Sequence, residues 1–290
     1  MTAARKPDIG RRPEVADLVR RALAEDIGPG DATTESLVPE DALAAGRIVA
    51  RKPCVIAGGP LVQAVFRELD PRVKVEIVIA DGEPAAAGAT AIRVAGPARA
   101  ILSGERTALN FLQRLSGIAT LTRRFVDRAA PLGVQVLDTR KTTPTLRQLE
   151  KYAVVCGGGA NHRTGLYDRV LIKDNHRALW SAGGRPRPLA QAVRAARERH
   201  PDLEIEIEVD SEAELRDALE GAPDWILLDN MTPEQWRRCA TIAAGRVRLE
   251  ASGGLSLDAV GALAGTGVDA ISIGALTHSA PAADLALDLD

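Results

Sequence analysis

The stretch LEIEIEVDSEAELRDALEGAPDWILLDN, residues 203–230, contains two apolar strand patterns separated by a helical one. LEIEIEV (203–209) and WILLD (225–229) have the length and composition of strands, whereas EAELRDALEG has apolar positions at helical spacing. Strands joined through a helix run parallel in one sheet, because the helix provides the crossover that a parallel connection needs. The stretch therefore predicts a β/α unit and a parallel sheet.

The same alternation continues on both sides of this stretch. The other strand patterns are VQVLD (134–138), RVLIK (169–173), VRLEA (247–251) and AISIG (270–274). Helical patterns, among them LAQAVRAARERH, PEQWRRCATIAAG and SLDAVGALAG, fill the gaps, and residues 104–129 predict one long helix before the first strand. A doubly wound open sheet and a β/α barrel both fit this alternation.

Polar residues and a glycine stand at the carboxyl ends of these strand patterns. They are Asp138, Lys173, Glu208, Asp229, Ser252 and Gly274. In a β/α barrel all such ends meet at one rim, whereas in an open sheet only those beside the switch point meet. Six candidates at strand ends favour an α/β barrel, open or incomplete.

The part of the chain before residue 104 has a different pattern. Residues 13–26 predict a helix, and GRIVARKPCVIAGG, VKVEIVIADGEP and TAIRVAGPARAIL predict short extended segments separated by glycine and proline. We expect a small α+β or sandwich-like unit there.

The composition excludes several classes of protein. In 290 residues, 46% are apolar, 26% are charged and 3% are aromatic, with a net charge of −2. This balance gives no electrostatic reason to expect nucleic-acid or membrane binding. The three cysteines are widely spaced and predict neither zinc nor disulfides, and the N-terminal residues show no apolar signal core. We expect a soluble, reduced, cytoplasmic protein.

Cationic residues gather around the predicted rim. They are Arg106, Arg140, Lys141, His162, Arg163 and Lys173. Any one of them is ordinarily a solvated surface residue. Lys173, however, ends an apolar strand, where a buried ammonium needs a charged partner or an anionic ligand. Several cations on one rim describe a pocket for a ligand with many negative oxygens.

Two acids end adjacent strand patterns. Glu208 and Asp229 should project near one another and could face Mg²⁺, sugar hydroxyls or a developing cation. The alternative is that Glu204, Glu206 and Glu208 form a solvated face of one strand.

Glycine-containing segments follow the last two strand patterns. The residues are Ser252, Gly253, Gly254, Ser272, Ile273 and Gly274. In barrels, the loops after the last two strands often hold phosphate on backbone N–H groups, although turns and helix caps also explain such glycines. Walker A, G-x-G-x-x-G and HExxH motifs are absent from the sequence, which disfavours nucleoside triphosphates, dinucleotides and zincin chemistry.

Several long motifs resemble the quinolinate phosphoribosyltransferase family, also called carboxylating nicotinate-nucleotide pyrophosphorylases. They are GERTALNFLQRLSGIAT, DTRKTTPTLRQLEKYAVVCGGGANHRTGLYDRVLIKDNH, IEIEVDSEAEL, ILLDNM, EASGGLSLDAV and SIGALTHS. The resemblance implies an N-terminal α/β sandwich domain (residues 1–110) and an open α/β barrel (111–290), paired as a homodimer. It also implies that about the last 15 residues return to the N-terminal domain.

The resemblance further implies an activity and the residues that carry it. Phosphoribosyl pyrophosphate and quinolinate would become nicotinate mononucleotide, pyrophosphate and CO₂, with Mg²⁺ as cofactor. The implied substrate ligands are Arg106 (across the dimer), Thr139, Arg140, Lys141, His162, Arg163 and Lys173, with Ser252, Gly253, Gly254, Ser272, Ile273 and Gly274 around the 5′-phosphate. Lys141, Glu208 and Asp229 are the implied catalytic residues, and the two acids would hold the metal, directly or through water.

The chain departs from the family pattern at Thr145, where glycine usually follows KTTP. A β-branched residue would be strained there if the position requires a positive φ, and we expect a local adjustment. Two rival interpretations remain open. One is a relative of the same fold acting on another ligand, such as the molybdenum-transport-associated proteins. The other is a non-catalytic phosphate-binding barrel.

Overall fold

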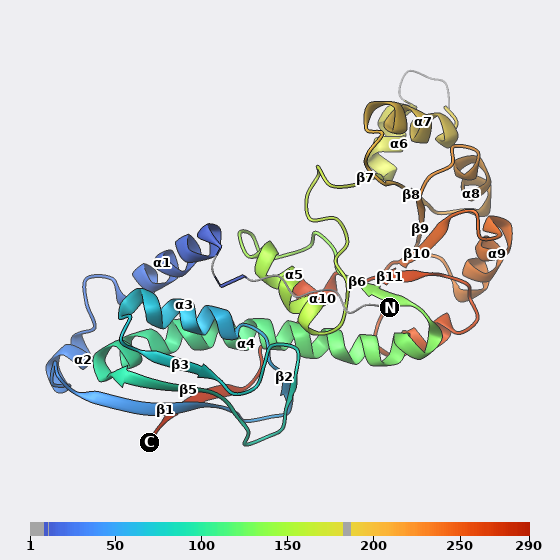
Figure 1. Ribbon diagram of the computed structural model, residues 1–290. Helices are drawn as coiled ribbons and strands as arrows, with labels where there is room; N and C mark the ends of the chain where they lie inside the picture. Colours follow the sequence, from blue (N-terminus) through green and yellow to red (C-terminus); the bar gives the residue numbers. More distant parts are fainter. Residues whose placement is uncertain (1–8, 11, 182–186) are drawn as a thin grey trace. The chain divides into compact units, whose positions relative to one another are not determined.

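The structure is a computed structural model that describes residues 9–10, 12–181 and 187–290 (Figure 1). The chain forms two compact units. Unit 1 comprises residues 1–123, 143–158 and 276–290, and unit 2 comprises residues 124–142 and 159–275. Each unit is therefore built from more than one segment of the chain.

Unit 1 contains an antiparallel sheet with helices. Its elements are α1 (Pro13–Ile27), α2 (Ala32–Leu37), β1 (Leu43–Ala50), β2 (Cys54–Val55), α3 (Gly59–Leu69), β3 (Lys74–Ile77), β4 (Pro84–Ala85), β5 (Thr90–Pro97), α4 (Ala98–Ala129), α5 (Arg147–Cys156), α10 (Ala275–His278) and β12 (Leu285–Leu289). The last residues of α4 and the first of α10 belong to unit 2.

The sheet of unit 1 has the strand order β12-β1-β5-β3, and β2 pairs with β4 separately. β12 runs antiparallel to β1, with Leu289 opposite Gly46, so the end of the chain completes this sheet. The interior of unit 1 includes Phe66 of α3 and Leu112 of α4, both fully buried. A side chain at Gly104 of α4 would collide with Leu69 and Phe66, so glycine permits the close approach of α4 to α3.

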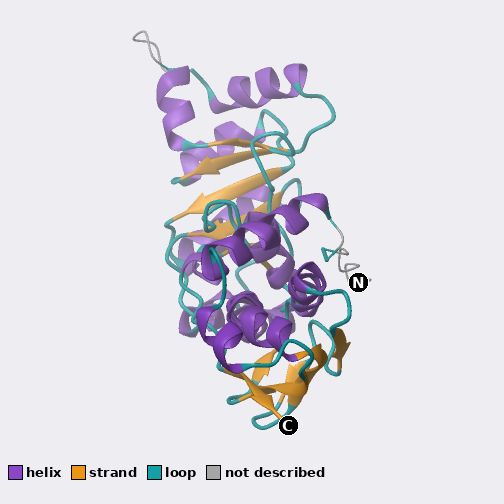
Figure 2. Ribbon diagram, turned by 90° about the vertical axis from the view of Figure 1, so that its left-hand side faces the viewer, coloured by secondary structure: helices purple, strands orange, loops and turns teal. Residues whose placement is uncertain are grey.

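Unit 2 contains a parallel sheet with helices outside it (Figures 1 and 2). Its elements are β6 (Gln135–Leu137), β7 (Val170–Ile172), α6 (Asp174–Trp180), α7 (Leu189–Arg199), β8 (Ile205–Val209), α8 (Glu212–Leu219), β9 (Trp225–Asp229), α9 (Pro233–Ala243), β10 (Arg248–Ser252) and β11 (Ala270–Ser272), with 3-10 helices η1 (Ala130–Leu132) and η2 (Asp258–Leu263). All six predicted strand patterns are strands, which confirms the α/β fold.

The six strands have the order β6-β11-β10-β9-β8-β7. A parallel bridge between Leu137 and Ala160 extends this sheet beyond β6. β7 ends the other side, and no pairing between β7 and β6 occurs in the described ranges, so the barrel is open. At the amino ends of the strands, the guanidinium groups of Arg169 and Arg248 lie over the ring of Trp225, 5.3 and 4.6 Å from its centre. This end of the sheet is filled by a stacked aromatic side chain.

Two predicted elements differ from the observed ones. The long helix begins at Ala98, earlier than predicted, and the residues ARAIL (98–102) are helical rather than extended. Pro97 ends β5, and Ile101 is fully buried on the same helical stripe as Ala108 and Leu112, which explains the earlier start. The pattern SLDAVGALAG forms only η2, because glycine at 261 and a left-handed Gly265 (φ 66°) oppose a longer helix.

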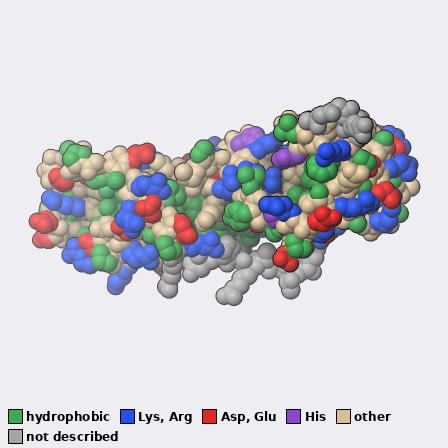
Figure 3. All heavy atoms as spheres, turned by 90° about the horizontal axis from the view of Figure 1, so that it is seen from above, with side chains coloured by type: hydrophobic (Ala, Val, Ile, Leu, Met, Phe, Trp, Pro, Cys, Tyr) green, Lys and Arg blue, Asp and Glu red, His purple; other side chains and the backbone are tan. Residues whose placement is uncertain are grey.

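Acidic and basic side chains are interspersed over the face seen in Figure 3, as the small net charge leads one to expect. None of the helices within the described ranges combines the length and hydrophobicity that a membrane span needs.

Candidate active site

The carboxyl ends of the unit 2 strands surround a cavity of about 150 Å³, here called the rim pocket. It is lined by Thr139, Arg140, Lys141, His162, Arg163, Leu171, Lys173, Leu227, Glu250, Ser252 and Ser272. Eight of these residues are among those that the sequence singled out: every lining residue except Leu171, Leu227 and Glu250. Eight predicted residues, among them Lys173 and Ser252 at strand ends, therefore meet around one cavity, as in a barrel.

The positive charge of the rim pocket is concentrated. Arg163 is half-buried, and its pKa is lowered first by burial and then by the charge of Arg140. Two guanidinium groups are held close together only when the surrounding fold enforces it, since like charges repel. An anion placed between them would relieve that repulsion.

The loop that carries His162 and Arg163 is fixed by the end of β6. Asp138 is fully buried and accepts a hydrogen bond from the backbone N–H of His162 at 2.9 Å. Ala160 N–H donates to Val136 O at 2.8 Å, and Asp138 N–H donates to Ala160 O at 3.1 Å. The segment after α5 is thus paired like a further strand, which places His162 inside the pocket.

Lys173, Glu208 and Asp229 lie together at the ends of β7, β8 and β9. Lys173 Nζ is 3.1 Å from Glu208 Oε2. The prediction that Lys173 is buried was wrong, because 46% of its side chain is exposed; the carboxylate partner that we expected is present. The pKa of Asp229 is raised, first by burial and then by the charge of Glu208, while Lys173 opposes the rise. These two acids are therefore close enough to interact electrostatically.

The loop after β10 passes close to the end of β9. Gly253 has a φ of 112°, and a side chain there would collide with Asn230. Asn230 N–H donates to Ser252 O at 3.0 Å, and Asn230 Nδ2 donates to Asp229 Oδ2 at 2.7 Å. Gly253 is needed for this close approach, and Gly254 (φ 54°) continues the left-handed turn.

The remaining predicted residues occupy different surroundings. Ser272 and Ile273 are buried at the end of β11, and Gly274 follows them. Arg106 lies on α4 in unit 1, is exposed, and makes no hydrogen bond or ion pair within the described ranges. The other predicted site residues belong to unit 2, whereas Arg106 belongs to unit 1.

Two residues that line the rim pocket, His162 and Glu250, form with Glu206 a buried cluster that the sequence did not reveal. His162 Nε2 is 3.0 Å from Glu206 Oε2 and 3.4 Å from Glu250 Oε2, and both glutamates are fully buried. The idea of a solvated face on LEIEIEV was therefore wrong for Glu206, and for Glu208, which is also buried. The available signal was the position of Glu206 and Glu250 inside strand patterns rather than at their carboxyl ends.

The two glutamates act on the protonation of His162. Burial is the largest influence and lowers the pKa of His162, but hydrogen bonds to Glu206 and Glu250 and their charges outweigh it and raise the pKa to about 9. The backbone N–H of Arg163 lies 2.7 Å from Nδ1, a hydrogen bond that only the neutral ring can accept. In either state the proton on Nε2 faces the carboxylates.

The turn after Lys141 is held from α5. Glu150, fully buried, accepts hydrogen bonds from Thr143 N–H at 3.1 Å and from the Thr143 hydroxyl at 2.8 Å. Arg114 Nη2 donates to the same carboxylate at 2.8 Å. Thr145 has a φ of 70°, so the expected adjustment has not moved its backbone out of the left-handed region.

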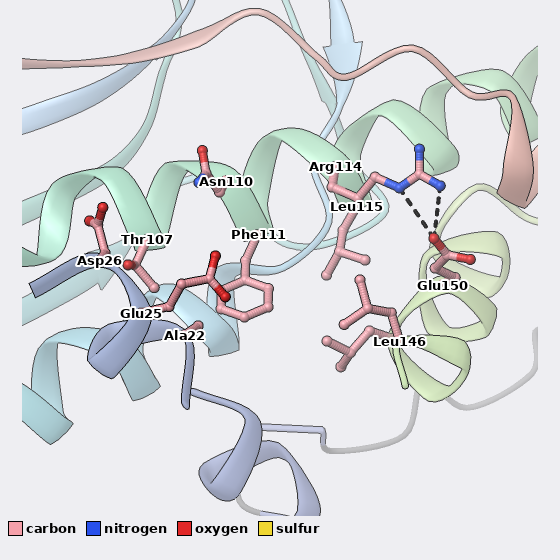
Figure 4. Close-up of a pocket in the computed structure, with 11 residues that line it drawn as sticks. Ala22, Glu25, Asp26, Thr107, Asn110, Phe111, Arg114, Leu115, Leu146 and Glu150 are labelled. Carbon is pink, nitrogen blue, oxygen red and sulfur yellow. Dashed lines mark hydrogen bonds and ion pairs between the residues drawn. The ribbon is translucent and has the colours of Figure 1, made fainter. Parts of the chain in front are cut away.

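A second cavity, of about 200 Å³, lies within unit 1 between α1, α4 and α5 (Figure 4). Its walls are partly apolar, with Phe111, Leu115 and Leu149. Its charged groups are two acids on α1, Glu25 and Asp26, and the Arg114–Glu150 pair, which is already neutralised. This cavity does not suit an anionic ligand, whereas the rim pocket does.

Two family models cover most of the chain. The description "Quinolinate phosphoribosyl transferase, N-terminal domain" matches residues 31–116, and the corresponding C-terminal domain matches residues 118–288. The chain belongs to the quinolinate phosphoribosyltransferase family.

Individual members of the family are similar over nearly their whole length. The chain is 41% identical to a probable nicotinate-nucleotide pyrophosphorylase [carboxylating] of Bacillus subtilis, covering 95% of this chain and 93% of that protein. It is 43% identical to the enzyme of that name from Mycobacterium leprae, with coverages of 94% and 96%. The solved nicotinate-nucleotide pyrophosphorylase of Francisella tularensis superimposes with a TM-score of 0.89 at 37% identity, covering 98% of this chain and 100% of that one.

Proposed function

We infer that this chain transfers phosphoribosyl from phosphoribosyl pyrophosphate to quinolinate with loss of CO₂, giving nicotinate mononucleotide and pyrophosphate for NAD biosynthesis. The observation that carries the inference is the rim pocket, where Arg140, Lys141, Arg163 and Lys173 surround one cavity. Quinolinate has two carboxylates and phosphoribosyl pyrophosphate carries several phosphate charges. Both need concentrated positive charge to bind side by side.

The cationic residues of the rim pocket match the carboxylate and phosphate groups of these two ligands. The guanidinium forks of Arg140 and Arg163 match carboxylate and phosphate oxygens in pairs, whereas the ammonium groups of Lys141 and Lys173 act as compact charges. A pocket that holds the pyridine nitrogen against the anomeric carbon brings the two reacting atoms together, and such proximity lowers the activation barrier substantially.

The chemistry requires no protein nucleophile. The ring nitrogen attacks the anomeric carbon, the bond from that carbon to the pyrophosphate oxygen breaks, and the positive charge that develops lies within reach of Glu208 or Asp229. The pyridinium then accepts the electron pair of the bond to the 2-carboxyl group as CO₂ leaves, and the ring carbon takes a proton from solvent.

The acids of the rim also fit the Mg²⁺ that the family implies. Glu208 and Asp229 are neighbouring carboxylates whose mutual repulsion helps to raise the pKa of Asp229, and oxygen ligands of this kind suit Mg²⁺. The chemistry that such an ion supplies is neutralisation of the charge on the departing pyrophosphate. Lys173 balances only part of the charge on this acid pair.

We further propose that the active unit is a homodimer in which Arg106 enters the neighbouring site. Its guanidinium group is exposed and unpaired within the described ranges, as expected for a residue whose ligand lies elsewhere. A cytoplasmic location is proposed as well, supported by three buried free thiols, Cys54, Cys156 and Cys239.

One assay tests the function directly. Protein, Mg²⁺, phosphoribosyl pyrophosphate and quinolinate should release CO₂ and form nicotinate mononucleotide. Nicotinate in place of quinolinate should not react, if the 2-carboxylate is required for binding. Turnover of nicotinate, or no turnover of quinolinate, would contradict the proposal and favour another ligand for the same fold.

A complementation experiment tests the dimer. Arg106→Ala and Lys141→Ala should each lower kcat/KM on the order of 100-fold or more, because each removes a charge from the site. Random exchange of the two variants should restore about a quarter of wild-type activity, since half of the dimers are hybrids with one intact site. No recovery after confirmed subunit exchange would show that Arg106 does not act across the interface.

A further inference from the structure

The ion pair of Lys173 and Glu208 lies at the free edge of the parallel sheet. β7 is the last strand in the sheet order, and within the described ranges β8 is the one strand that pairs with it. The last paired residues of these two strands are Ile172 and Ile207. The pairing therefore ends one residue before Lys173 and Glu208, where an edge strand held from one side is able to separate locally from its neighbour.

Arg177 joins these two strand ends. It lies one turn after Lys173 on α6, and its backbone N–H donates to Lys173 O at 3.0 Å. Its Nη1 atom donates to the backbone carbonyl oxygen of Glu208 at 3.0 Å. The side chain of Arg177 is only 14% exposed, so little water competes for this hydrogen bond. Arg177 is thus attached through its backbone to one partner of the ion pair and through its side chain to the other.

The guanidinium group of Arg177 is itself held by two acids that follow β8. Nη1 also donates to Glu214 Oε2 of α8, and Nη2 lies 3.5 Å from Asp210 Oδ2. The same oxygen of Glu214 accepts a hydrogen bond from the backbone N–H of Asp210 at 3.1 Å. The two carboxylates more than balance the charge of Arg177. Its influence on the rim pocket is therefore one of geometry rather than of added positive charge.

We propose that Arg177 is a positioning residue that holds Lys173 and Glu208 at their observed separation on the open edge of the barrel. The proposal rests on the proposed function, in which Glu208 lies within reach of the positive charge that develops at the anomeric carbon. Such stabilisation requires the carboxylate to be in place before the reaction, because a displacement of about 1 Å can cost on the order of 100-fold in rate. A closed barrel has no edge strand, whereas here a side chain supplies the missing support.

The alternative is that Arg177 only packs α6 against α8 and stabilises the fold. The two roles differ in what they change. A residue that only stabilises the fold changes the fraction of protein that is folded, whereas a positioning residue changes the rate of each folded molecule through the group that it positions.

Variants of Arg177 test the effect on rate. Arg177→Met removes the hydrogen bonds but keeps much of the side-chain length, so kcat should fall on the order of 10-fold or more. Arg177→Lys keeps the charge but loses the planar fork, and its kcat should lie between those of the methionine variant and the wild type. Arg238→Met is the matched control, because Arg238 of α9 pairs with Glu212 of α8 outside the rim pocket, and its kcat should stay within about 2-fold of wild type. An unchanged kcat in Arg177→Met, or an equal loss in Arg238→Met, would overturn the proposal.

A double-mutant cycle shows whether Arg177 acts through Glu208. In protein that already carries Glu208→Gln, Arg177→Met should lower kcat by a further factor of less than about 2, because the carboxylate that Arg177 positions is gone. The same loss in both backgrounds would contradict the proposal. Urea unfolding of every variant separates a lower rate from a smaller folded fraction.

Hydrogen exchange followed by mass spectrometry is independent of turnover. Backbone amides of β7 and of the first turn of α6 should exchange faster in Arg177→Met than in wild type, while those of β9 should not change. If Arg177→Met does not fold, Glu214→Gln replaces it, because this variant removes one support of the guanidinium group and leaves Arg177 in place. Unchanged exchange in β7 would refute the positioning role even if kcat falls. Failure of the proposed function is distinguishable, because wild-type protein would then not convert quinolinate although the difference in exchange is present.

Discussion

Replacement of Thr145 by glycine should stabilise the protein by roughly 0.5–1 kcal/mol, although it removes a side chain. Thr145 has a φ of 70°, a conformation that β-branched residues rarely adopt. Its side chain is exposed and makes no hydrogen bond within the described ranges, so its loss breaks no contact of that kind.

The magnitude follows from two opposing contributions. The left-handed region costs an L-residue with a Cβ atom about 1–2 kcal/mol, and glycine is free of this cost. Glycine also gives the unfolded chain more freedom, which offsets about 0.5–1 kcal/mol of the gain. The difference favours the glycine variant, and the β-branch of threonine adds to the strain that is relieved.

Urea unfolding followed by circular dichroism measures the effect. The midpoint should rise while the slope of the transition stays constant, since the buried surface is unchanged. Ala222→Gly is the matched control, because Ala222 has a similar φ of 54° without a β-branch, and its gain should be smaller. A lower midpoint for Thr145→Gly than for wild type would refute the reasoning, as would a larger gain at Ala222 than at Thr145.

Two further predictions concern buried charges. The pKa of His162 is raised to about 9 from its usual 6.5, so the stability that its proton contributes should be complete below about pH 6.5 and be lost as pH rises through 9. Unfolding midpoints measured between pH 6 and 10 would test this dependence. A midpoint that does not change over this range would contradict the prediction. Glu150→Gln should lower the free energy of unfolding by about 2–3 kcal/mol, because it leaves the buried partner of Arg114 without its charge. Asp258→Asn, which breaks the exposed ion pair with Arg128, should lower it by less than about 0.5 kcal/mol. Equal losses of stability in the two variants would show that burial does not strengthen the pair of Arg114 and Glu150.

The sequence was most informative where local pattern and tertiary role coincide. The strands of unit 2 are apolar and short, and helical patterns separate them, so their parallel pairing could be predicted. Their polar ends could be assigned to one rim for the same reason, and eight of the predicted site residues line the rim pocket, among them the strand-end residues Lys173 and Ser252. The exception is Lys173, whose apolar context suggested burial, whereas the end of a strand leaves its ammonium group exposed beside Glu208.

By itself, the sequence determined the order of strands and helices, the cationic character of the rim and the family to which the chain belongs. Only the tertiary structure decided which polar residues meet inside the sheet. Glu206 and Glu250 are separated by 43 intervening residues yet both approach His162, because β8 and β10 flank β9 and the open barrel points their side chains inward. Charge, burial and hydrogen bonding at such a point depend on neighbours from distant segments, which local pattern does not encode. Thr145 shows the same limit: its identity is plain in the sequence, but its left-handed backbone is set by the turn around it.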